Sequence, residues 1–574
     1  MLATCLCDRG QIVCGELTIE RVRESIELKG YETWKLQIRT PPPTGMNQRP
    51  VAWLRVEGPR LRQGVRAALA NGYNSWSASP FLGRDDTLLA ETKDLQRFFG
   101  DDRLFLYAEQ PGHFHAWSWS ILDEGNGRSA FLGAIDEDRF FNLFEFNLRL
   151  ETCHIWLNID GFDFSRMTSE FRQGPVTIAH LIVPLENEEE RDSLDRVTKA
   201  WMTLVRQGER IPRLRNQHES TDTQPPLLGY TSWYNRYTNI DEKYLLEMLS
   251  HVKALTTAQV FQVDDGYQKC VGDWLIPSRG FASGVSVIAA RARNLGLTPG
   301  IWCAPFVTME FAASTEAHPD WLLRDEGGDV VVCGDFRHWG GKFLAWDTEN
   351  LDYRAWMEAV LKTMLVDWGF GFLKADFLYA AAMLPKGSRP RAERGARAHQ
   401  WLHEVVRQNG AQLLSCGAVL ANSYGRCDYA RIGPDVALSW ELAEERHHTS
   451  REKCSTRSAI INTATRSVLN GVAFGNDPDV VILREDNQAL SLEQRAALAA
   501  TNAAFGGLIF SSDDPALYEE DSRKLLHAIE ATAASLRPRG FHYESRDALG
   551  IETNCGIFAI DLDEKSPKAR LIQA

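Results

Sequence analysis

The amino-acid sequence predicts an α/β protein with a central (β/α)8 TIM barrel, preceded by an N-terminal β-sandwich and followed by a small C-terminal β-domain. Three observations support this fold class. The chain has 574 residues, which is too long for one hydrophobic core. Short apolar runs alternate with turn signals up to about residue 190, whereas strand-like and helix-like segments alternate from residue 227. We therefore expect domains at 1–195, 196–525 and 526–574.

The β-sandwich is predicted from short apolar runs that are separated by turn signals. The clearest of these runs cover residues 31–40, 49–58, 128–137 and 153–162. A polar stretch with prolines, residues 206–226, comes after them. This composition is typical of a connection, so we expect it to link the sandwich to the next domain.

The barrel is predicted from eight strand–helix units within about 300 residues. The strand candidates cover residues 227–234, 258–265, 297–306, 369–377, 411–419, 427–435, 471–479 and 507–514. Amphipathic stretches lie between them, for example at 241–255, 353–368 and 397–409. Most of these strands end in polar or charged residues. In barrels of this kind, active sites form at the carboxyl ends of the strands.

The last part of the chain returns to strand-like alternation. Residues 541–564 read FHYESRDALGIETNCGIFAIDLDE, in which apolar and polar residues alternate. The stretch is short, so we expect only a small β-domain there.

Composition and charge exclude several classes of protein. Apolar residues make up 44% of the chain and charged residues 24%, which is typical of a folded soluble protein. The net charge of −14 would repel phosphate backbones, so nucleic acid is not an expected partner. The first residues lack a basic start followed by an apolar run, and no run of 18 apolar residues occurs. We therefore expect neither a signal peptide nor a membrane span.

The cysteines and histidines do not predict a metal site. The 11 cysteines are scattered, and the histidines, including His447 and His448, have no ligand spacing. We expect reduced thiols, a cytoplasmic location, and neither a metal nor another cofactor.

The stretch GFGFLKADFLY, residues 369–379, places two charges in an apolar strand. Buried charges are costly unless they are paired or used in a reaction. Side chains alternate along a strand, so Lys374 and Asp376 point to the same side. We expect Lys374 to lower the pKa of Asp376 and to keep it ionised, as a nucleophile requires. The alternative is a structural ion pair.

A second carboxylate follows the sixth barrel strand. In RIGPDV, residues 431–436, the Gly433-Pro434 pair turns the backbone and presents Asp435 outward. Glycosidases use a second carboxylate as acid and base, which is the role we predict for Asp435. By itself, Asp435 could equally form an Asx turn or a helix cap.

Further polar and aromatic residues lie at neighbouring strand ends. Asp264 and Asp265 in VDDGY end the second strand, where a carboxylate can accept hydrogen bonds from two sugar hydroxyls. A capping role is the alternative for Asp265. Trp302, Trp233 and Tyr234 lie at other strand ends, where their rings could pack on a sugar face or simply fill the core.

One aromatic candidate comes from the N-terminal domain. The motif NGYNSWS, residues 71–77, is a turn signal that places Trp76 on a loop. From such a loop Trp76 could reach a site across a domain interface, or it could pack inside the sandwich.

Taken together, these motifs resemble glycoside hydrolase family 36, the melibiase-type α-galactosidases. The resemblance rests on NGYNSWS, SWYNRYT, QVDDGYQ, GIWCAPF, FLKADF, LSCGA, RIGPDV and NDPDVVILR, which occur in the family's order from about residue 70 to 515. It implies hydrolysis of terminal α-galactosides (melibiose or raffinose type) with retention, through a covalent galactosyl-enzyme and without a metal. The partner it implies is a small α-galactoside or oligosaccharide, and a homo-oligomer is possible.

The resemblance also implies a role for each site residue. Asp376 would be the nucleophile and Asp435 the acid/base. The residues implied in galactose binding are Trp76, Tyr234, Asp264, Asp265, Trp302, Lys374, Cys416 and Arg431.

The sequence departs from the family pattern in three places. The segment CGAVLANSYG, residues 416–425, lacks a proline that is common two residues after Cys-Gly, which leaves the preference at the sugar 2-position open. FGNDPD replaces a bulkier WLNDPD-like pattern, and the C-terminal domain is short. Three alternatives follow: an α-N-acetylgalactosaminidase, a galactosyl-transferring enzyme, and a catalytically silent sugar-binding protein.

Overall fold

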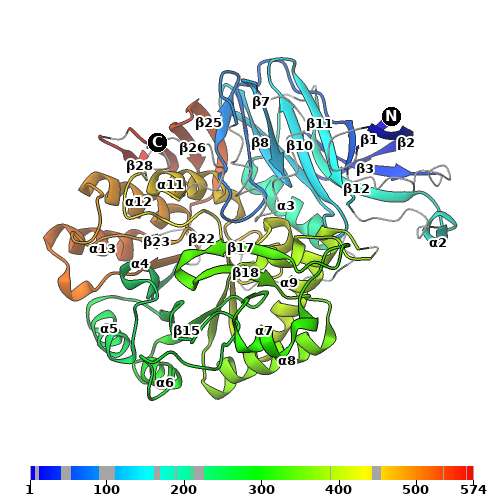
Figure 1. The fold of residues 1–574 in the computed structure, drawn as a ribbon. Coiled ribbons are helices and arrows are strands. Elements are labelled where there is room, and N and C mark those ends of the chain that lie inside the picture. Colours follow the sequence, from blue (N-terminus) through cyan, green and yellow to red (C-terminus); the bar gives the residue numbers. More distant parts are fainter. Residues whose placement is uncertain are drawn as a thin grey trace.

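The structure is a computed structural model. It describes residues 2–6, 12–39, 53–88, 110–160, 168–186, 188, 190–207, 211, 225–387, 389–441, 454–533, 536–563 and 565–572. Three regions follow one another along the chain: a β-sandwich, a strand–helix barrel and a small β-sheet (Figure 1). The fold class predicted from the sequence is therefore confirmed. His447, His448 and most of the expected linker lie outside the described residues.

The N-terminal region is an antiparallel sheet that folds over on itself. Among the described residues, its strands are β1 (Leu2–Leu6), β2 (Ile12–Ser25), β3 (Tyr31–Ile38), β4 (Trp53–Glu57), β5 (Ala67–Leu69), β6 (Phe81–Gly83), β7 (His113–Trp117), β8 (Trp119–Gly125), β9 (Arg128–Ala134), β10 (Phe141–Asn147), β11 (Thr152–Asn158) and β12 (Val176–Pro184). Their order is β6-β5-β8-β9-β12-β3-β2-β1-β4-β11-β10-β7. The four expected strands are all present, as β3, β4, β9 and β11.

The long strand β2 joins the two layers of the sandwich. Its first part pairs with β1, and its second part, from Ile19 onward, pairs with β3. Leu36 and Leu132 from one layer share a fully buried cluster with Phe144 and Ile155 from the other. The sandwich core therefore lies between the two halves of one folded sheet.

The central region is a parallel barrel. Within the described ranges its strands are β13 (Leu227–Thr231), β14 (Val260–Val263), β15 (Thr298–Cys303), β19 (Phe372–Ala375), β20 (Gln412–Ser415), β21 (Tyr429–Arg431), β22 (Gly475–Asp477), β23 (Val480–Val481) and β24 (Leu508–Ser511). All their pairings are parallel. The eight strand positions expected from the sequence are confirmed, with β22 and β23 together forming the seventh.

The seventh strand is broken in the middle, and each of its halves pairs with a different neighbour, so that it joins the two edges of the barrel. Its first half, β22, pairs with β21, and its second half, β23, pairs with β24, which in turn pairs with β13. Between the halves, Asp479 has a left-handed backbone (φ 76°) that turns the chain from one neighbour to the other. An amide hydrogen bond of 2.8 Å from Gly507 to the carbonyl of Asn476 joins the two edges.

Helices follow the strands and cover the barrel (Figure 1). The helices of the described chain are α2 (Thr168–Phe171), α3 (Leu194–Gln207), α4 (Trp233–Arg236), α5 (Glu242–Leu255), α6 (Ser286–Asn294), α7 (Ala313–Ala317), α8 (Leu351–Lys362), α9 (Arg391–Gln408), α10 (Leu420–Ser423), α11 (Thr456–Thr465), α12 (Leu492–Phe505) and α13 (Glu520–Thr532). Side-chain caps at Asp241, Asn350 and Ser491 begin α5, α8 and α12 by accepting from backbone amides. The three amphipathic stretches predict α5, α8 and α9 correctly, and α8 continues into a π-helical turn, Thr363–Asp367.

An excursion between β15 and α8 has no counterpart in the sequence prediction. In this part of the described chain, β16 (Val307–Met309), β17 (Val332–Phe336) and β18 (Gly341–Ala345) form a separate antiparallel sheet in the order β16-β18-β17. Because it follows the carboxyl end of β15, it lies on the face of the barrel where the polar strand ends gather. In Figure 1 the β17–β18 hairpin lies between the barrel and the sandwich.

The sandwich contacts the barrel through the loop at residues 71–79. The fully buried Arg466, in the turn after α11, donates to Asn71 Oδ1 at 3.0 Å and to the backbone carbonyls of Gly72, Asn74 and Ser75. The same guanidinium donates to the carbonyl of Ile432 next to β21. One buried side chain thus ties the loop to the barrel strand that leads to Asp435.

The C-terminal region is a small antiparallel sheet packed on the barrel. Among the described residues it contains β25 (Pro538–Ser545), β26 (Ala548–Thr553), β27 (Gly556–Asp561) and β28 (Lys568–Ile572), in that order. Phe558 of β27 packs edge-on against Phe505 at the end of α12. The boundaries 195/196 and 525/526 stay predictions, and the helices α3 and α13 run across them.

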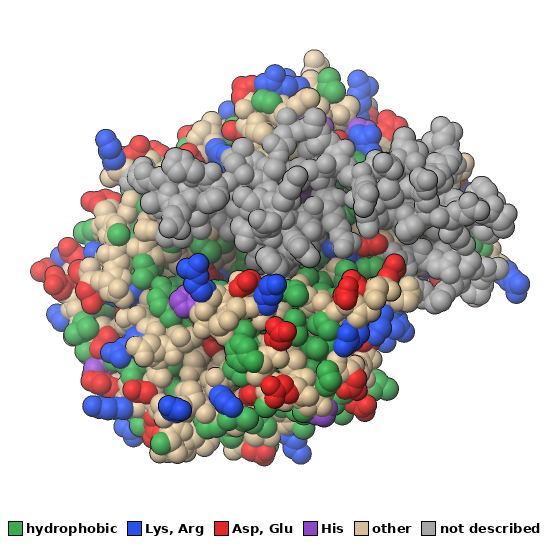
Figure 2. All heavy atoms as spheres, in the orientation of Figure 1, with side chains coloured by type: hydrophobic (Ala, Val, Ile, Leu, Met, Phe, Trp, Pro, Cys, Tyr) green, Lys and Arg blue, Asp and Glu red, His purple; other side chains and the backbone are tan. Residues whose placement is uncertain are grey.

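The described residues show a surface of mixed charge, and they contain neither a membrane-spanning helix nor a metal-binding cluster. Side chains of both charges are interspersed on the face drawn in Figure 2. Within the described ranges no helix is long and apolar enough to cross a membrane. A search of the same residues finds no cluster of three or more His, Cys, Asp or Glu side chains that could hold a metal ion.

Candidate active site

A cavity of about 380 Å³ opens at the carboxyl ends of the barrel strands. Seven of the predicted site residues line it: Trp76, Asp264, Asp265, Trp302, Lys374, Asp376 and Asp435. Tyr234, Cys416 and Arg431 are not among the lining residues, although each of them contacts a group at the site. The structure therefore brings all ten predicted residues to one place, in two layers.

Asp376 lies at the end of β19 with both carboxylate oxygens held. The indole Nε1–H of Trp302 donates to Oδ2 at 3.1 Å, and the backbone amide of Phe377 donates to Oδ1 at 2.8 Å. The Cys416 thiol also donates to this carboxylate. Phe377 adopts a left-handed backbone (φ 55°), which places its amide beside the preceding carboxylate. The orientation of Asp376 is thus fixed by three donors from three different strand ends.

The partner of Lys374 differs from the sequence prediction. Its Nζ forms an ion pair with Asp264 Oδ2 at 2.9 Å. The described residues show no hydrogen bond or ion pair between Lys374 and Asp376. Burial would lower the pKa of Lys374, but the Asp264 carboxylate raises it well above its ordinary value, so Lys374 stays charged. Asp264 Oδ2 also accepts from Gln262 at 2.6 Å and from Thr231 at 3.1 Å.

The expected lowering of the Asp376 pKa is also wrong in its net direction. Burial raises the pKa of Asp376, while Lys374 and the hydrogen bonds from Cys416 and Trp302 oppose that rise. The sequence argument weighed the nearby cation but not the loss of water, which is the larger effect. Lys374 therefore limits the rise in the pKa of Asp376 rather than reversing it.

Asp265 is held by a residue of the excursion. The indole of Trp339 donates to Asp265 Oδ2 at 2.7 Å, and Gln268 donates to Oδ1 at 2.5 Å. Burial raises the pKa of Asp265 to about 6, and these two hydrogen bonds oppose the rise. Asp265 is therefore oriented by a cavity-lining tryptophan instead of capping a helix.

Asp435 occupies a different environment from Asp376. Its side chain is 45% exposed, and its Oδ1 accepts from Arg431 Nη2 at 2.8 Å. The buried Arg431 also forms an ion pair with Asp479. One carboxylate of the site is thus buried and fixed, whereas the other reaches solvent.

Tyr234 and Asp479 support Asp435 from behind. The Tyr234 hydroxyl donates to Asp479, and Arg431 Nη2 lies 3.1 Å from the same hydroxyl. Asp479 Oδ2 also accepts from the backbone amide of Val436 at 2.8 Å, which fixes the turn that carries Asp435. Burial raises the pKa of Asp479 to about 7, although Arg431 opposes that rise.

Trp76 reaches the cavity from the sandwich, as one of the two sequence interpretations proposed. Its ring packs edge-on against Phe377 at 5.2 Å and Tyr379 at 5.9 Å between centroids. It lies directly on Gly417, where an added Cβ would come within 2.7 Å of the indole. The backbone amide of Ser75 donates to the carbonyl of Ala418 at 2.8 Å, so the two loops are joined on either side of this contact.

Sequence reasoning missed several residues of the site. Trp339 and Phe336 line the cavity from the β17–β18 hairpin, and Asp479 anchors Arg431. The NDPD motif could have indicated Asp479, because it repeats the pattern of an acid at a strand end. The excursion gives no comparable signal, since Phe336 and Trp339 do not lie directly at the end of a barrel strand.

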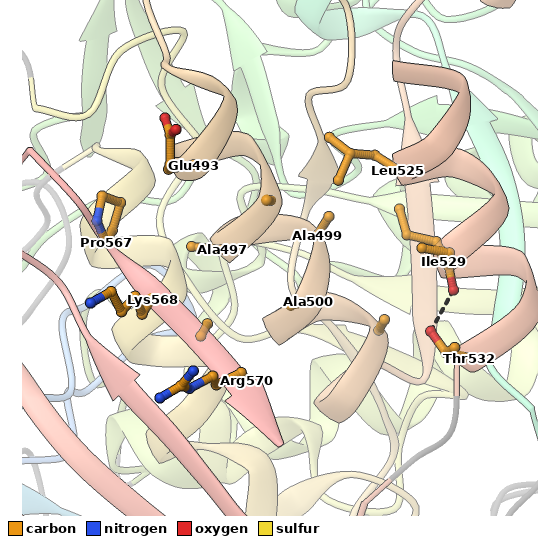
Figure 3. A pocket seen from close by; sticks show the side chains of 14 residues that line it. Glu493, Ala497, Ala499, Ala500, Leu525, Ile529, Thr532, Pro567, Lys568 and Arg570 are labelled. Carbon is orange, nitrogen blue, oxygen red and sulfur yellow. Dashed lines mark hydrogen bonds between the residues drawn. The ribbon is translucent and has the colours of Figure 1, made fainter. Parts of the chain in front are cut away.

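A second cavity of similar volume has a different lining. It has a volume of about 410 Å³ and lies between α12, α13 and β28 (Figure 3). Its walls are mostly small apolar side chains, including Ala497, Ala500 and Ile529. Glu493 is the carboxylate among its lining residues, and it is not opposed by a second acid there. This hollow lacks the paired acids of the cavity on the barrel face.

The geometry on the barrel face suits acid–base and nucleophilic chemistry on a polyhydroxylated molecule. Asp376 is oriented and surrounded by donors, and Asp435 is close to water, so the two acids can play different roles. Asp264 and Asp265 offer acceptors, and Trp302 and Trp339 offer ring faces. Such a combination of fixed polar groups and aromatic walls is typical of a small-molecule site.

Comparisons with known sequences find a family model and a curated relative. A family model described as Melibiase matches residues 192–392. Among curated proteins, the α-galactosidase AgaA of Geobacillus stearothermophilus is 23% identical over 300 residues, which cover 49% of this chain and 35% of AgaA. The match thus spans about a third of the length of that relative.

Solved structures give a similar result over more of the chain. TtGalA, an α-galactosidase from Thermus thermophilus in complex with p-nitrophenyl α-D-galactopyranoside, is 25% identical with a TM-score of 0.67, covering 93% of this chain and 98% of that one. A second TtGalA structure, in complex with stachyose, is 26% identical with a TM-score of 0.66, covering 89% and 99%. The A355E variant of AgaA from Geobacillus stearothermophilus, in complex with 1-deoxygalactonojirimycin, shares the fold at 12% identity and a TM-score of 0.56, covering 93% of this chain and 71% of that one.

Proposed function

We propose that this chain, which carries a melibiase domain and resembles the α-galactosidases of glycoside hydrolase family 36, is a retaining exo-α-galactosidase. Its substrates would be terminal α-galactosides of the melibiose and raffinose type. The observation that supports this proposal best is the pair of unlike carboxylates, Asp376 and Asp435, on one cavity. Retaining glycosidases need one carboxylate as nucleophile and another as acid and base.

In the first step, Asp376 would attack the anomeric carbon of the bound galactose. Trp302 and the amide of Phe377 hold the carboxylate, so little reorientation is needed before attack. Lys374 opposes the rise in its pKa and thereby favours the ionised form that attacks. A covalent galactosyl-enzyme would result, with the bond to the leaving group broken.

Asp435 would supply the proton for the leaving group and later remove one from water. Its 45% exposure lets it exchange protons with solvent, as both halves of this role require. Arg431 holds Asp435 in place and is itself held by Asp479 and Tyr234. Because they do not line the cavity, we propose that Arg431, Tyr234 and Cys416 position the two acids.

The remaining lining residues would bind the sugar. Asp264 and Asp265 would accept from its hydroxyls, and Lys374 would donate to them. Trp76, Trp302 and Trp339 would enclose its faces. We further propose a cytoplasmic enzyme that works without a cofactor or nucleic acid. An α-N-acetylgalactosaminidase and a galactosyl-transferring enzyme remain the alternatives on this scaffold.

Two experiments test the proposal. Rates on the nitrophenyl derivatives of α-galactose, α-N-acetylgalactosamine and α-glucose should be highest for α-galactose. No turnover of any of them would favour the catalytically silent sugar-binding protein. A mechanism-based galactosyl label should attach to Asp376 in a peptide map, and NMR should show α-galactose as the first product. Labelling of another residue, or a β-galactose product, would overturn the mechanism.

A further inference from the structure

The ion pair between Arg431 and Asp435 conflicts with the role proposed for Asp435. A general acid must carry a proton when it meets the leaving group. A guanidinium beside a carboxyl group favours the ionised form instead, because the positive charge stabilises the carboxylate. Arg431 Nη2 lies 2.8 Å from Asp435 Oδ1. For Asp435 to act as the acid, another group has to counter the charge of Arg431.

Asp479 is placed to counter this charge. Its Oδ2 forms an ion pair with the same Arg431 nitrogen that binds Asp435. The side chain of Asp479 is 5% exposed, whereas that of Asp435 is 45% exposed. Opposite charges attract more strongly where they are buried, since little water screens them. The pair between Arg431 and Asp479 is therefore the stronger of the two.

The hydrogen bonds around Arg431 support the same ranking. Its Nη2 carries two hydrogens but faces three oxygens, which belong to Asp435, Asp479 and the Tyr234 hydroxyl at 3.1 Å. Asp479 Oδ2 is fixed by further donors, namely the Tyr234 hydroxyl and the backbone amide of Val436 at 2.8 Å. Asp435 thus competes for Arg431 with a carboxylate that is already held in place.

The electrostatic surroundings of Arg431 point in the same direction. Burial would lower the pKa of Arg431, but the Asp479 carboxylate raises it, and Asp435 has a smaller effect of the same sign. The further ionisable groups that interact with Asp435 are Tyr234, Tyr237, Cys416 and Asp477. These groups are neutral or acidic, so Arg431 supplies the positive charge that has to be countered.

We propose that Asp479 is a positioning residue that counters the charge of Arg431 and thereby lets Asp435 keep the proton that it must donate. This inference rests on the proposed α-galactosidase function, and it concerns a residue that does not line the cavity. Once Asp435 has given its proton to the oxygen of the leaving group, it carries a negative charge itself. Arg431 then stabilises this ionised form until Asp435 takes a proton from water.

The test replaces Asp479 by asparagine. Asp479→Asn removes the negative charge, keeps an acceptor oxygen, and suits the left-handed backbone at this position (φ 76°). Tyr234→Phe is a second variant, since it removes a donor to Asp479 and one of the three oxygens that face Arg431. The matched control is Asp428→Asn. Asp428 is buried like Asp479 and accepts a backbone amide at 2.8 Å, but it lies before β21, at the amino end of that strand.

We expect Asp479→Asn to change the pH dependence of kcat/KM for melibiose. The whole charge of Arg431 then acts on Asp435, which loses its proton more readily, so the alkaline limb should move to lower pH by about one pH unit or more. Tyr234→Phe should move it in the same direction by a smaller amount, and Asp428→Asn should leave it in place.

The size of the loss should also depend on the leaving group. At the pH optimum of the unmodified protein, kcat/KM of Asp479→Asn should fall about tenfold or more for melibiose but less than about threefold for dinitrophenyl α-galactoside, which departs without a proton. Equal losses on both substrates, or an alkaline limb that does not move, would overturn the inference, because a merely structural residue acts on both substrates alike.

Two further outcomes are decisive. If circular dichroism shows that Asp479→Asn does not fold, an unmoved alkaline limb in Tyr234→Phe would overturn the inference. If the unmodified protein turns over neither substrate, the proposed function is wrong, and this inference is wrong with it.

Discussion

The two cavities of this protein have similar volumes and opposite linings. The cavity on the barrel face measures about 380 Å³ and is lined by five aspartates and a lysine among other residues, whereas the hollow at α12, α13 and β28 measures about 410 Å³ and is lined mostly by apolar side chains. The two cavities therefore differ in their linings and not in their volumes. In the first cavity, charged groups such as Lys374 and Asp264 hold one another in fixed positions.

The cost of each cavity also differs. Empty apolar space costs stability because lining atoms lose packing partners. Buried charges cost more, and they persist only where other groups pair with them. Lys374 with Asp264, and Arg431 with Asp435 and Asp479, are such pairs. Substitutions in the two cavities should consequently affect different measurements.

The largest effect is expected for Asp376→Gly. Turnover should fall by more than about 10⁴-fold, because no other lining group is placed to attack the anomeric carbon. Azide should fill the vacated space and convert an activated α-galactoside into β-galactosyl azide, which NMR identifies. The thermal midpoint should not fall, since a buried carboxylate is removed. If Asp376→Gly kept an activity near that of the unmodified protein, Asp376 would not be the nucleophile, and the paired acids would not mark the barrel-face cavity as the site.

Asp435→Ala should have the next largest effect, and its size should depend on the leaving group. Loss of a general acid costs about 10²–10⁴-fold when the leaving group needs a proton. The loss in kcat/KM should thus be large for melibiose and much smaller for dinitrophenyl α-galactoside. Equal losses on both substrates would assign Asp435 a binding role.

Lys374→Met should shift the pH dependence of kcat/KM. Lys374 lowers the pKa of Asp376, so its removal raises that pKa further. Asp376 must be ionised to attack, and the acid limb of the profile should therefore move to higher pH. We also expect kcat to fall by about 10²-fold as Asp264 loses its partner. Lys386→Met, which breaks an ion pair with Asp347 away from the cavity, is the control; an unmoved acid limb in Lys374→Met contradicts this interpretation.

Trp76→Ala should act mainly on substrate binding. The indole is only half-buried and contacts Phe377, Tyr379 and Gly417 at the cavity wall. We expect KM to rise about tenfold, with little loss of stability. If Trp76 were instead fully buried in the sandwich core, its replacement by alanine would cost about 3–5 kcal/mol of stability. A large fall in the thermal midpoint with normal kinetics would therefore contradict the site role.

The smallest effect on turnover is expected in the second cavity. Ala500→Val adds two methyl groups to the hollow between α12 and α13. Its kcat/KM should stay unchanged, and its thermal midpoint should move by a few degrees at most. The sign depends on how well the added volume fits. A marked fall in kcat/KM would mean that packing in the alanine-lined hollow affects the geometry of the site.

Most of the barrel could be predicted because its strands carry their own signals. Each apolar run ends in a polar residue at the site, so Asp264, Asp376 and Asp435 were identified from local sequence. Trp76 was also found, because a tryptophan after a turn signal stands out on a loop.

The pairings within the site could not be predicted in the same way. Lys374 lies two residues from Asp376 but bonds to Asp264, which is 110 residues away in the sequence. Sequence distance favours the first pairing, whereas the barrel brings the ends of β14 and β19 within reach of each other across β15 and so decides the second. Trp339 was missed because it is delivered by an insertion whose position depends on tertiary packing alone.

The bond between Arg466 and the loop at residues 71–79 sets an order of events during synthesis. Gly72 and Arg466 are 394 positions apart, and a ribosome adds roughly 5–20 residues per second. Roughly 20–80 s therefore pass between the synthesis of the loop that carries Trp76 and the synthesis of the arginine that hydrogen-bonds to this loop. Over that interval a nascent chain has no complete site. The cavity that Trp76 lines can be completed only when the later part of the barrel has reached a sandwich that was made first.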